Sequence, residues 1–137
     1  MISNFPLMAI VLFAYNVLIF GLGVGGSDWT HAIFTVNMVS GVPWTMTIGD
    51  LMILFGLFLL FFEILKATRI GRMSIVDHLL STLVLIGFLV EFLLVQGAAT
   101  SVFFILMVMT LVDVMAGFSV SIRSATRDVS LGDGSGL

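Results

Sequence analysis

Residues 48–66, IGDLMILFGLFLLFFEILK, decide the fold class. Apolar residues cover every face of a helix with this sequence, so such a helix has no polar side to turn toward water. A transmembrane helix needs about 20 mostly apolar residues to cross roughly 30 Å of hydrocarbon. The stretch therefore predicts a membrane-spanning helix rather than a core helix of a water-soluble domain.

Three further stretches meet the same criterion, at residues 6–24, 74–95 and 101–122. Composition agrees, because 60% of the residues are hydrophobic and only 9% are charged, whereas soluble domains carry about 25% charged residues. We predict an all-α membrane protein in which four transmembrane helices form an up-down bundle within residues 1–123. The Gly-, Ser- and Asp-rich end of the chain, 124–137, is expected to be a disordered tail.

Basic residues predict the orientation. Lys66, Arg69 and Arg72 follow the second stretch, and Arg123 and Arg127 follow the fourth. The positive-inside rule places both groups in the cytoplasm, and the two assignments agree only if an even number of spans separates them. We expect a multi-pass protein of a bacterial inner membrane with both termini cytoplasmic. Cleavage of the first span as a signal peptide is the less favoured alternative, because no Lys or Arg precedes it.

The outer segment between the first two spans predicts a β-hairpin at about residues 33–47. Apolar and polar residues alternate from Phe34 to Met38 and again from Val42 to Met46, and a period of two is typical of a strand. A three-residue loop, residues 39–41, aligns the two apolar sets on one face. It also places Gly41 at the loop position that favours a left-handed backbone.

The predicted pairs are Met38 with Val42, Val36 with Trp44, and Phe34 with Met46. We expect the apolar face to rest on the mouth of the bundle or on lipid, with open edges that can pair with another chain. Pro43 lacks an N–H and is expected at an unpaired edge position. An interfacial helix broken near Gly41 and Pro43 is the alternative.

Asp113 lies about 18 Å along the fourth span, close to the bilayer midplane. A carboxylate at such a depth costs at least about 2.5 kcal/mol on insertion scales, so it should face protein or water. Asn16 lies at a matching depth in the first span. If the first and last helices are neighbours, Asn16 is expected to hydrogen-bond a neutral Asp113. Two roles stay open for Asp113: a polar contact between helices, or a carrier of protons or cations.

Two glutamates complete the intramembrane candidates. Glu91 lies near the outer end of the third span, where no Lys or Arg can pair with it, so we expect it protonated, hydrated or turned into the bundle. It shares a helical stripe with Ser81 and Phe88, which predicts an inward face. Glu63 precedes Lys66 by three residues, a spacing that predicts an ion pair snorkelling at the inner interface. Proton transfer through Glu63 is the alternative.

Small residues predict where helices approach one another. Gly117 follows Asp113 by four positions, and Ser121 follows Gly117 by four. This small-xxx-small track is typical of packed transmembrane helices. Gly23 continues a seven-residue repeat through Asn16 on the first span. We therefore expect Gly117, Ser121 and Gly23 at helix-packing positions.

Several function classes find no support in the sequence. The chain has no cysteine, which excludes disulfides and thiolate chemistry. His31 and His78 stand without other metal-ligand residues at suitable spacing, so we expect no metal site and no cofactor. With five basic residues and a net charge of −3, we expect no basic surface that could bind nucleic acid. The expected partners are membrane lipids together with further copies of the chain or a larger membrane complex.

Three blocks resemble small, uncharacterised four-span bacterial inner-membrane proteins: WTMTIGDLMILFGLFLLFFEILKATR (44–69), SIVDHLLSTLVLIGFLVEFLLV (74–95) and AATSVFFILMVMTLVDVMAGFSVSIRSATRDVS (98–130). The resemblance covers most of the chain. It implies the same four-helix architecture, and no function comes with it.

With no catalytic constellation in view, we expect a non-enzymatic accessory or assembly subunit that self-associates or binds a larger membrane complex. The alternative is a small proton- or cation-coupled transporter or channel that uses Asp113, Glu91 and Glu63.

Overall fold

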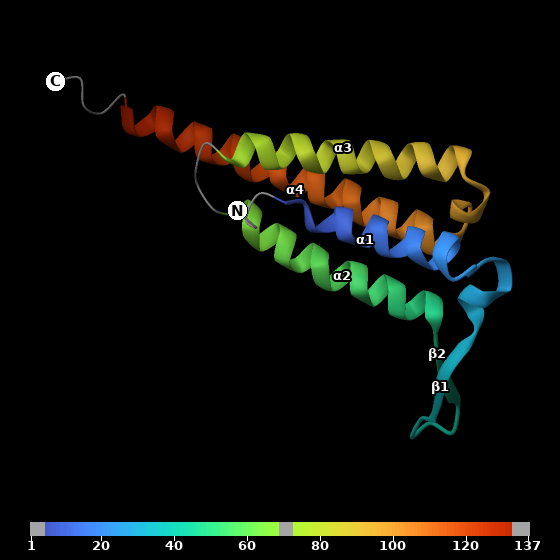
Figure 1. The fold of residues 1–137 in the computed structure, drawn as a ribbon. Coiled ribbons are helices and arrows are strands. Elements are labelled where there is room, and N and C mark those ends of the chain that lie inside the picture. Colours follow the sequence, from blue (N-terminus) through green and yellow to red (C-terminus); the bar gives the residue numbers. More distant parts are fainter. Residues whose placement is uncertain (1–4, 69–72, 133–137) are drawn as a thin grey trace.

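A computed structural model describes residues 5–68 and 73–132, except for the side chains of Met73, Ser74, Ser121 and residues 123–132 (Figure 1). This part of the chain is mostly helical and carries one small antiparallel sheet, so the coarse prediction of a helical protein with a hairpin is confirmed. The main elements are α1 (Leu7–Asn16), β1 (Ala32–Asn37), β2 (Pro43–Thr47), α2 (Ile48–Ala67), α3 (Met73–Leu94) and α4 (Ser101–Gly132). The π-helix η2 (Val17–Gly21) continues α1, and the 3-10 helices η3 (Gly26–Thr30) and η4 (Gln96–Ala98) lie in connections.

Three helical stretches are long and apolar enough to cross a membrane: Ile48–Ala67, Ile75–Leu94 and Ser101–Val120. The first helix is shorter, because its apolar run with η2 covers only Leu7–Gly21. At 1.5 Å per residue it spans about 22 Å, compared with roughly 30 Å of hydrocarbon. The sequence placed its end at residue 24. Glycine stops it earlier, since Gly23 has a left-handed backbone with φ +69° that no helix can continue.

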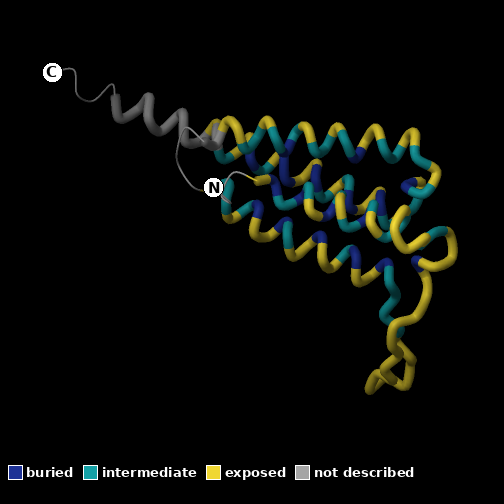
Figure 2. Tube along the Cα trace, in the orientation of Figure 1, coloured by how far each residue is buried: buried dark blue, intermediate teal, exposed yellow. Residues whose placement is uncertain are grey.

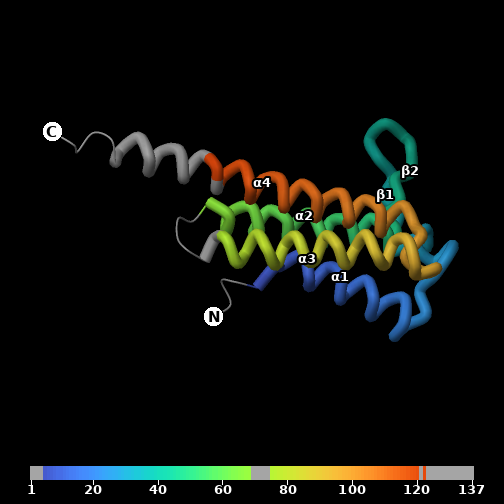
Figure 3. The backbone as a smooth tube through the Cα atoms, turned by 90° about the horizontal axis from the view of Figure 1, so that it is seen from above, coloured from blue at the N-terminus to red at the C-terminus, as the bar shows by residue number. Residues whose placement is uncertain are grey.

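The four helices alternate in direction (Figures 1 and 3). Within the described residues, α1 packs against α2 and α3, and α4 packs against the same two helices. The pairs α1 with α4 and α2 with α3 lie across the diagonals. The end of α2 and the start of α1 and of α3 are therefore at one end of the bundle, and the hairpin and the α3–α4 connection are at the other (Figure 1).

Aromatic side chains fill the centre of the bundle. The Tyr15 ring meets the Phe103 ring edge-on with centroids 4.7 Å apart, and Phe88 lies 5.1 Å from Phe103 on the other side. All three side chains are fully buried. The outer faces of the helices are exposed and apolar (Figure 2), as at Phe58, which is 62% exposed. A large continuous apolar surface suits contact with lipid rather than with water.

Two glycines let α2 lie close to its neighbours. A Cβ atom at Gly56 would be 2.6 Å from Leu106 Cδ2 on α4, and one at Gly49 would be 2.9 Å from the Trp29 carbonyl oxygen. Both belong to the buried stripe of α2, which also contains Met52, Leu60 and Glu63. This stripe was not predicted, although Gly49 and Gly56 are seven residues apart, a spacing that indicates a packing face.

Helix α4 continues to Gly132, so the predicted end at residue 122 and the disordered tail from residue 124 are corrected as far as the structure reaches. Residues 123–131 contain neither Gly nor Pro and include the good helix formers Ala125 and Arg127, so nothing in them stops the helix. The helix ends where the glycine-rich sequence begins. The remainder of the predicted tail, 133–137, lies outside the described residues.

The hairpin forms in the predicted register. Phe34 pairs with Met46 and Val36 with Trp44, the Met38 N–H donates to the Val42 carbonyl oxygen at 3.0 Å, and Gly41 has φ +83°. The alternative of a broken interfacial helix is therefore wrong. Both strands extend away from the helices (Figure 3), so of the two places expected for the apolar face the mouth of the bundle is wrong, and contact with lipid stays a prediction.

Candidate functional site

The four predicted polar residues form two groups at opposite ends of the bundle, so Asn16 and Asp113 are not at the matching depth expected for them. Asn16 and Glu91 meet near the hairpin end, whereas Glu63 and Asp113 belong to the other end. The predicted hydrogen bond between Asn16 and Asp113 is therefore wrong. The reason is depth: Glu63, which is close to Asp113, bonds to Leu7 at the start of α1, whereas Asn16 lies at the end of α1 and bonds to Glu91.

Asn16 instead joins α1 to α3. Its side-chain Nδ2 donates to Glu91 Oε2 at 3.0 Å and to the Leu12 carbonyl oxygen at 2.9 Å. Glu91 Oε1 is buried and has no hydrogen-bond partner among the described residues. Of the expectations for Glu91, the inward orientation is confirmed. The neighbouring residues Ser81 and Phe88 of the same stripe are also buried.

A tyrosine network lies beside this contact. Tyr15 Oη donates to the Gly97 carbonyl oxygen at 3.0 Å and lies 2.6 Å from Thr100 Oγ1. Because a phenol has one proton, the Thr100 hydroxyl is the donor to Tyr15. Thr100 also accepts from the Phe103 N–H at 3.2 Å, which caps the start of α4. The network ties α1 to the α3–α4 connection.

Trp29 belongs to the same region and is buried, with only 4% of its surface exposed. Its ring stacks on the Tyr15 ring at 4.7 Å with an interplanar angle of 7°. The sequence analysis did not identify Tyr15 or Thr100. The available signal was that Tyr15 is the one tyrosine of the chain and that a buried phenol needs a partner.

At the other end of the bundle, Glu63 and Lys66 form the predicted ion pair, with Nζ 3.4 Å from Oε2. Glu63 does not snorkel, however, because it is 4% exposed and turned inward. Its Oε2 accepts the Leu7 N–H at 2.9 Å, and Lys66 Nζ donates to the Phe5 carbonyl oxygen at 2.7 Å. A carboxylate at the start of α1 also matches the helix dipole. The pair fastens α1 to the end of α2.

Asp113 lies next to this pair, on α4, and is also 4% exposed. Its carboxyl group is hydrogen-bonded to Ser81 of α3 and interacts electrostatically with Glu63 and Lys66 of α2. The other carboxyl oxygen, Oδ2, is buried without a hydrogen-bond partner in the described part of the chain. Asp113 is thus a second buried carboxyl group near the Glu63–Lys66 pair, an arrangement that is costly unless a proton, water or cation compensates the second charge.

The three predicted packing positions have different outcomes. Gly117 is buried, and a Cβ atom there would lie 2.5 Å from the His78 ring of α3, so its role in packing is confirmed. The prediction for Gly23 is wrong, because this residue lies in the loop after η2 and a Cβ atom there would have nothing within 4 Å. The side chain of Ser121 lies outside the described residues. Within the described chain, no group of three His, Cys, Asp or Glu residues is placed to hold a metal ion.

The hairpin offers a second kind of surface, with two chemically different faces. Alternation along the strands puts six apolar residues on one face: Phe34, Val36, Met38, Val42, Trp44 and Met46. The Phe34 and Trp44 rings meet edge-on at 5.9 Å. On the opposite face, Thr35 Oγ1 and Thr45 Oγ1 are hydrogen-bonded at 2.9 Å. Both faces are largely exposed, so the apolar one is uncovered.

The junction between hairpin and helix is held by hydrogen bonds. Asp50 Oδ2 accepts from the Thr47 N–H at 3.0 Å and from Thr47 Oγ1 at 2.8 Å, and Thr47 Oγ1 accepts the Asp50 N–H at 3.1 Å. This capping box starts α2 directly after β2. The Ile48 N–H also donates to the His31 carbonyl oxygen at 3.1 Å. Both strands are therefore attached to the first turn of α2.

Comparisons with protein-family models, with curated proteins and with solved structures gave no match for this chain.

Proposed function

We propose that the chain is a non-enzymatic accessory or assembly subunit of a bacterial inner membrane, which self-associates or binds a larger membrane complex. In this proposal it crosses the bilayer four times with both termini in the cytoplasm. The alternating helix directions support it, and so do the basic residues that follow α2 and the apolar part of α4. The short first helix needs local thinning of the bilayer or help from its flanking residues.

The observation that carries the proposal is the uncovered hairpin edge. A sheet of two strands leaves one edge of each strand unpaired, and such an edge can accept a strand from another chain. The polar groups inside the bundle, by contrast, join helices to one another: Asn16 to Glu91, Tyr15 to Gly97, and Glu63 to the start of α1.

Of the two free strand edges, the edge of β1 is better suited to accept a strand from another chain. In an antiparallel pair, hydrogen-bonded and non-hydrogen-bonded positions alternate. The bond between Met38 and Val42 therefore directs the N–H groups of Thr35 and Asn37 away from β2. The outward edge of β2 offers fewer free N–H groups to a partner strand, because Pro43 has no N–H and the Thr47 N–H already bonds to Asp50. Pro43 thus occupies the edge position that the sequence predicted for it.

Extraction in mild detergent followed by native mass measurement tests the proposal. We expect particles heavier than the 14.8 kDa chain, made of several copies or containing a partner. The Thr35→Pro substitution removes one outward N–H from the β1 edge and leaves the ladder to β2 in place, so it should reduce the heavier species. Thr35→Ala is the matched control, since it loses the same hydroxyl contact with Thr45 and keeps the N–H.

Two results would count against the proposal. One is a strictly monomeric, partner-free particle under every mild extraction condition. The other is an equal loss of assembly in Thr35→Pro and Thr35→Ala, which would assign the effect to the threonine pair and not to the edge.

A second candidate, a proton- or cation-coupled transporter or channel, is favoured by one specific observation. Glu63 and Asp113 are both buried at the same end of the bundle, where Lys66 forms an ion pair with Glu63. Glu91 is a further carboxyl group toward the other end, bonded to Asn16. Carboxyl groups spread over depth are what an ion pathway requires.

A further inference from the structure

The hairpin carries its apolar face without any covering element of the described chain. All residues of β1 are exposed, and Trp44 on β2 is 43% exposed. The six apolar residues of this face, defined above, include two aromatic residues and two methionines. From Ala32 to Thr47 the sequence contains no charged residue, so covering this face desolvates no ion.

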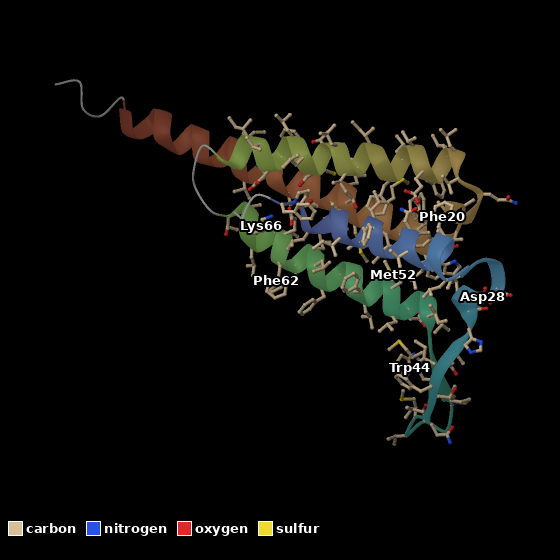
Figure 4. All side chains as sticks on the ribbon, viewed as in Figure 1. Phe20, Asp28, Trp44, Met52, Phe62 and Lys66 are labelled. Carbon is tan, nitrogen blue, oxygen red and sulfur yellow. The ribbon has the colours of Figure 1, made fainter. Side chains whose placement is uncertain are left out.

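The direction of the hairpin decides what can lie against it. The strands run crosswise to the helices, at one end of the bundle (Figure 1). Figure 4 shows Trp44 on the side of the hairpin toward which the helices extend. The apolar face of the hairpin and the exposed apolar surface of α2 therefore border the same space beside the bundle. This surface of α2 includes Leu51, Leu54 and Phe58. If the helices span a bilayer, lipid occupies that space.

We propose that the apolar face of the hairpin lies flat on the outer leaflet of the membrane, with Trp44 at the boundary between headgroups and acyl chains. This inference rests on the proposed membrane-spanning arrangement. Trp favours that boundary because its ring is large and apolar and carries a polar N–H. The opposite face, with Thr35 and Thr45 bonded to each other, faces water.

The lipid contact also orients the hairpin for its proposed partner. The capping box of Thr47 and Asp50, together with the bond from Ile48 to His31, fixes the strands relative to α2. A hairpin held flat on lipid directs its strand edges sideways, in the plane of the membrane. The free edge of β1 is then presented to other proteins in the same bilayer.

Tryptophan fluorescence tests this contact, because the chain has only two tryptophans. Trp29→Phe leaves Trp44 as the single probe. The substitution keeps an aromatic ring against Tyr15 and removes no described hydrogen bond, since Trp29 Nε1 has no partner. The variant is reconstituted in phosphatidylcholine vesicles whose acyl chains are brominated close to the headgroups. We expect about a twofold or larger loss of Trp44 emission in these vesicles, and weak quenching by iodide in the water.

The matched control places the probe on the other face of the same strand. In the Trp29→Phe, Trp44→Phe background, Thr45→Trp should be quenched by iodide and little affected by the brominated lipid. Equal behaviour of the two probes would overturn the inference. Shielding of Trp44 from both quenchers would also overturn it, because a protein and not lipid would then cover the face.

A third probe separates this inference from the membrane proposal. Phe58→Trp, in the same background without other tryptophans, reports on the exposed face of α2 and should be quenched by lipids brominated in mid-chain. Quenching of this probe without quenching of Trp44 rejects only the lipid contact of the hairpin. No lipid quenching at either position rejects the membrane-spanning arrangement itself.

Discussion

Asp113 is the residue whose chemistry is least explained by packing. It interrupts an apolar run in α4, hydrogen-bonds to Ser81 of α3 and interacts with Glu63 and Lys66 of α2. One of its oxygens is buried without a described partner. A purely structural contact between helices contributes about 0.6 kcal/mol on average, which is less than the cost of burying a charged carboxylate without compensation. The difference makes Asp113 the position where transport and packing roles can be separated.

Asp113→Asn keeps the size and a hydrogen bond to Ser81 but cannot carry a proton or a full charge. If the chain conducts protons or cations, flux in reconstituted liposomes should fall about tenfold or more. Asp50→Asn is the control, because Asp50 is exposed and Asn also serves in helix capping. An Asp113→Asn flux equal to the unsubstituted protein would eliminate the transport candidate and leave the assembly proposal standing.

At the scale of single elements, the close approach of α2 and α4 depends on Gly56. Gly56→Ala should lower the unfolding temperature in detergent, because the new methyl group meets Leu106 Cδ2 at 2.6 Å and Met109 Sδ at 3.3 Å. Overpacking of this kind costs about 1–3 kcal/mol.

Gly87→Ala on α3 is the control for this substitution. Its Cβ would meet only Leu12 Cδ2, at an ordinary 3.5 Å. Both substitutions gain the same helix propensity, about 1 kcal/mol, so the difference between them isolates the packing. Equal unfolding temperatures for the two variants would show that the α2–α4 interface is looser than described.

Local patterns in the sequence predicted elements well. The register of the hairpin followed from alternation and from the left-handed preference of Gly41, and the Glu63–Lys66 pair followed from spacing within one helix. Neighbours on different helices could not be predicted in the same way. The levels at which the helices begin in the bundle decide which residues lie side by side, and counting residues along each span does not give these levels. Asn16 was therefore assigned to Asp113 although it bonds to Glu91.

Contacts between distant segments were missed as well. Trp29 lies in η3, in the connection between η2 and β1, and its ring is buried against Tyr15 of α1. The path of that connection back over the end of α1 creates the contact, and no periodic pattern in the sequence specifies this path. At Gly23, a seven-residue repeat suggested a packing position, but the glycines around it end the helix first.

For the whole molecule, the account depends on an even number of crossings with the hairpin on the outside. The chain lacks cysteine, so single cysteines can report sidedness in intact spheroplasts through a membrane-impermeant maleimide. Ser3→Cys, Val39→Cys, Thr68→Cys and Ser130→Cys sample the two ends, the hairpin tip and the end of α2. Val39 suits the purpose because it is fully exposed in the hairpin loop.

The account predicts that only the Val39→Cys variant reacts in intact spheroplasts and that the other three react after lysis. Labelling of Val39→Cys and Thr68→Cys from the same side would contradict it, because α2 would then not cross the bilayer. Labelling of Ser3→Cys from outside would show that the short first helix does not cross.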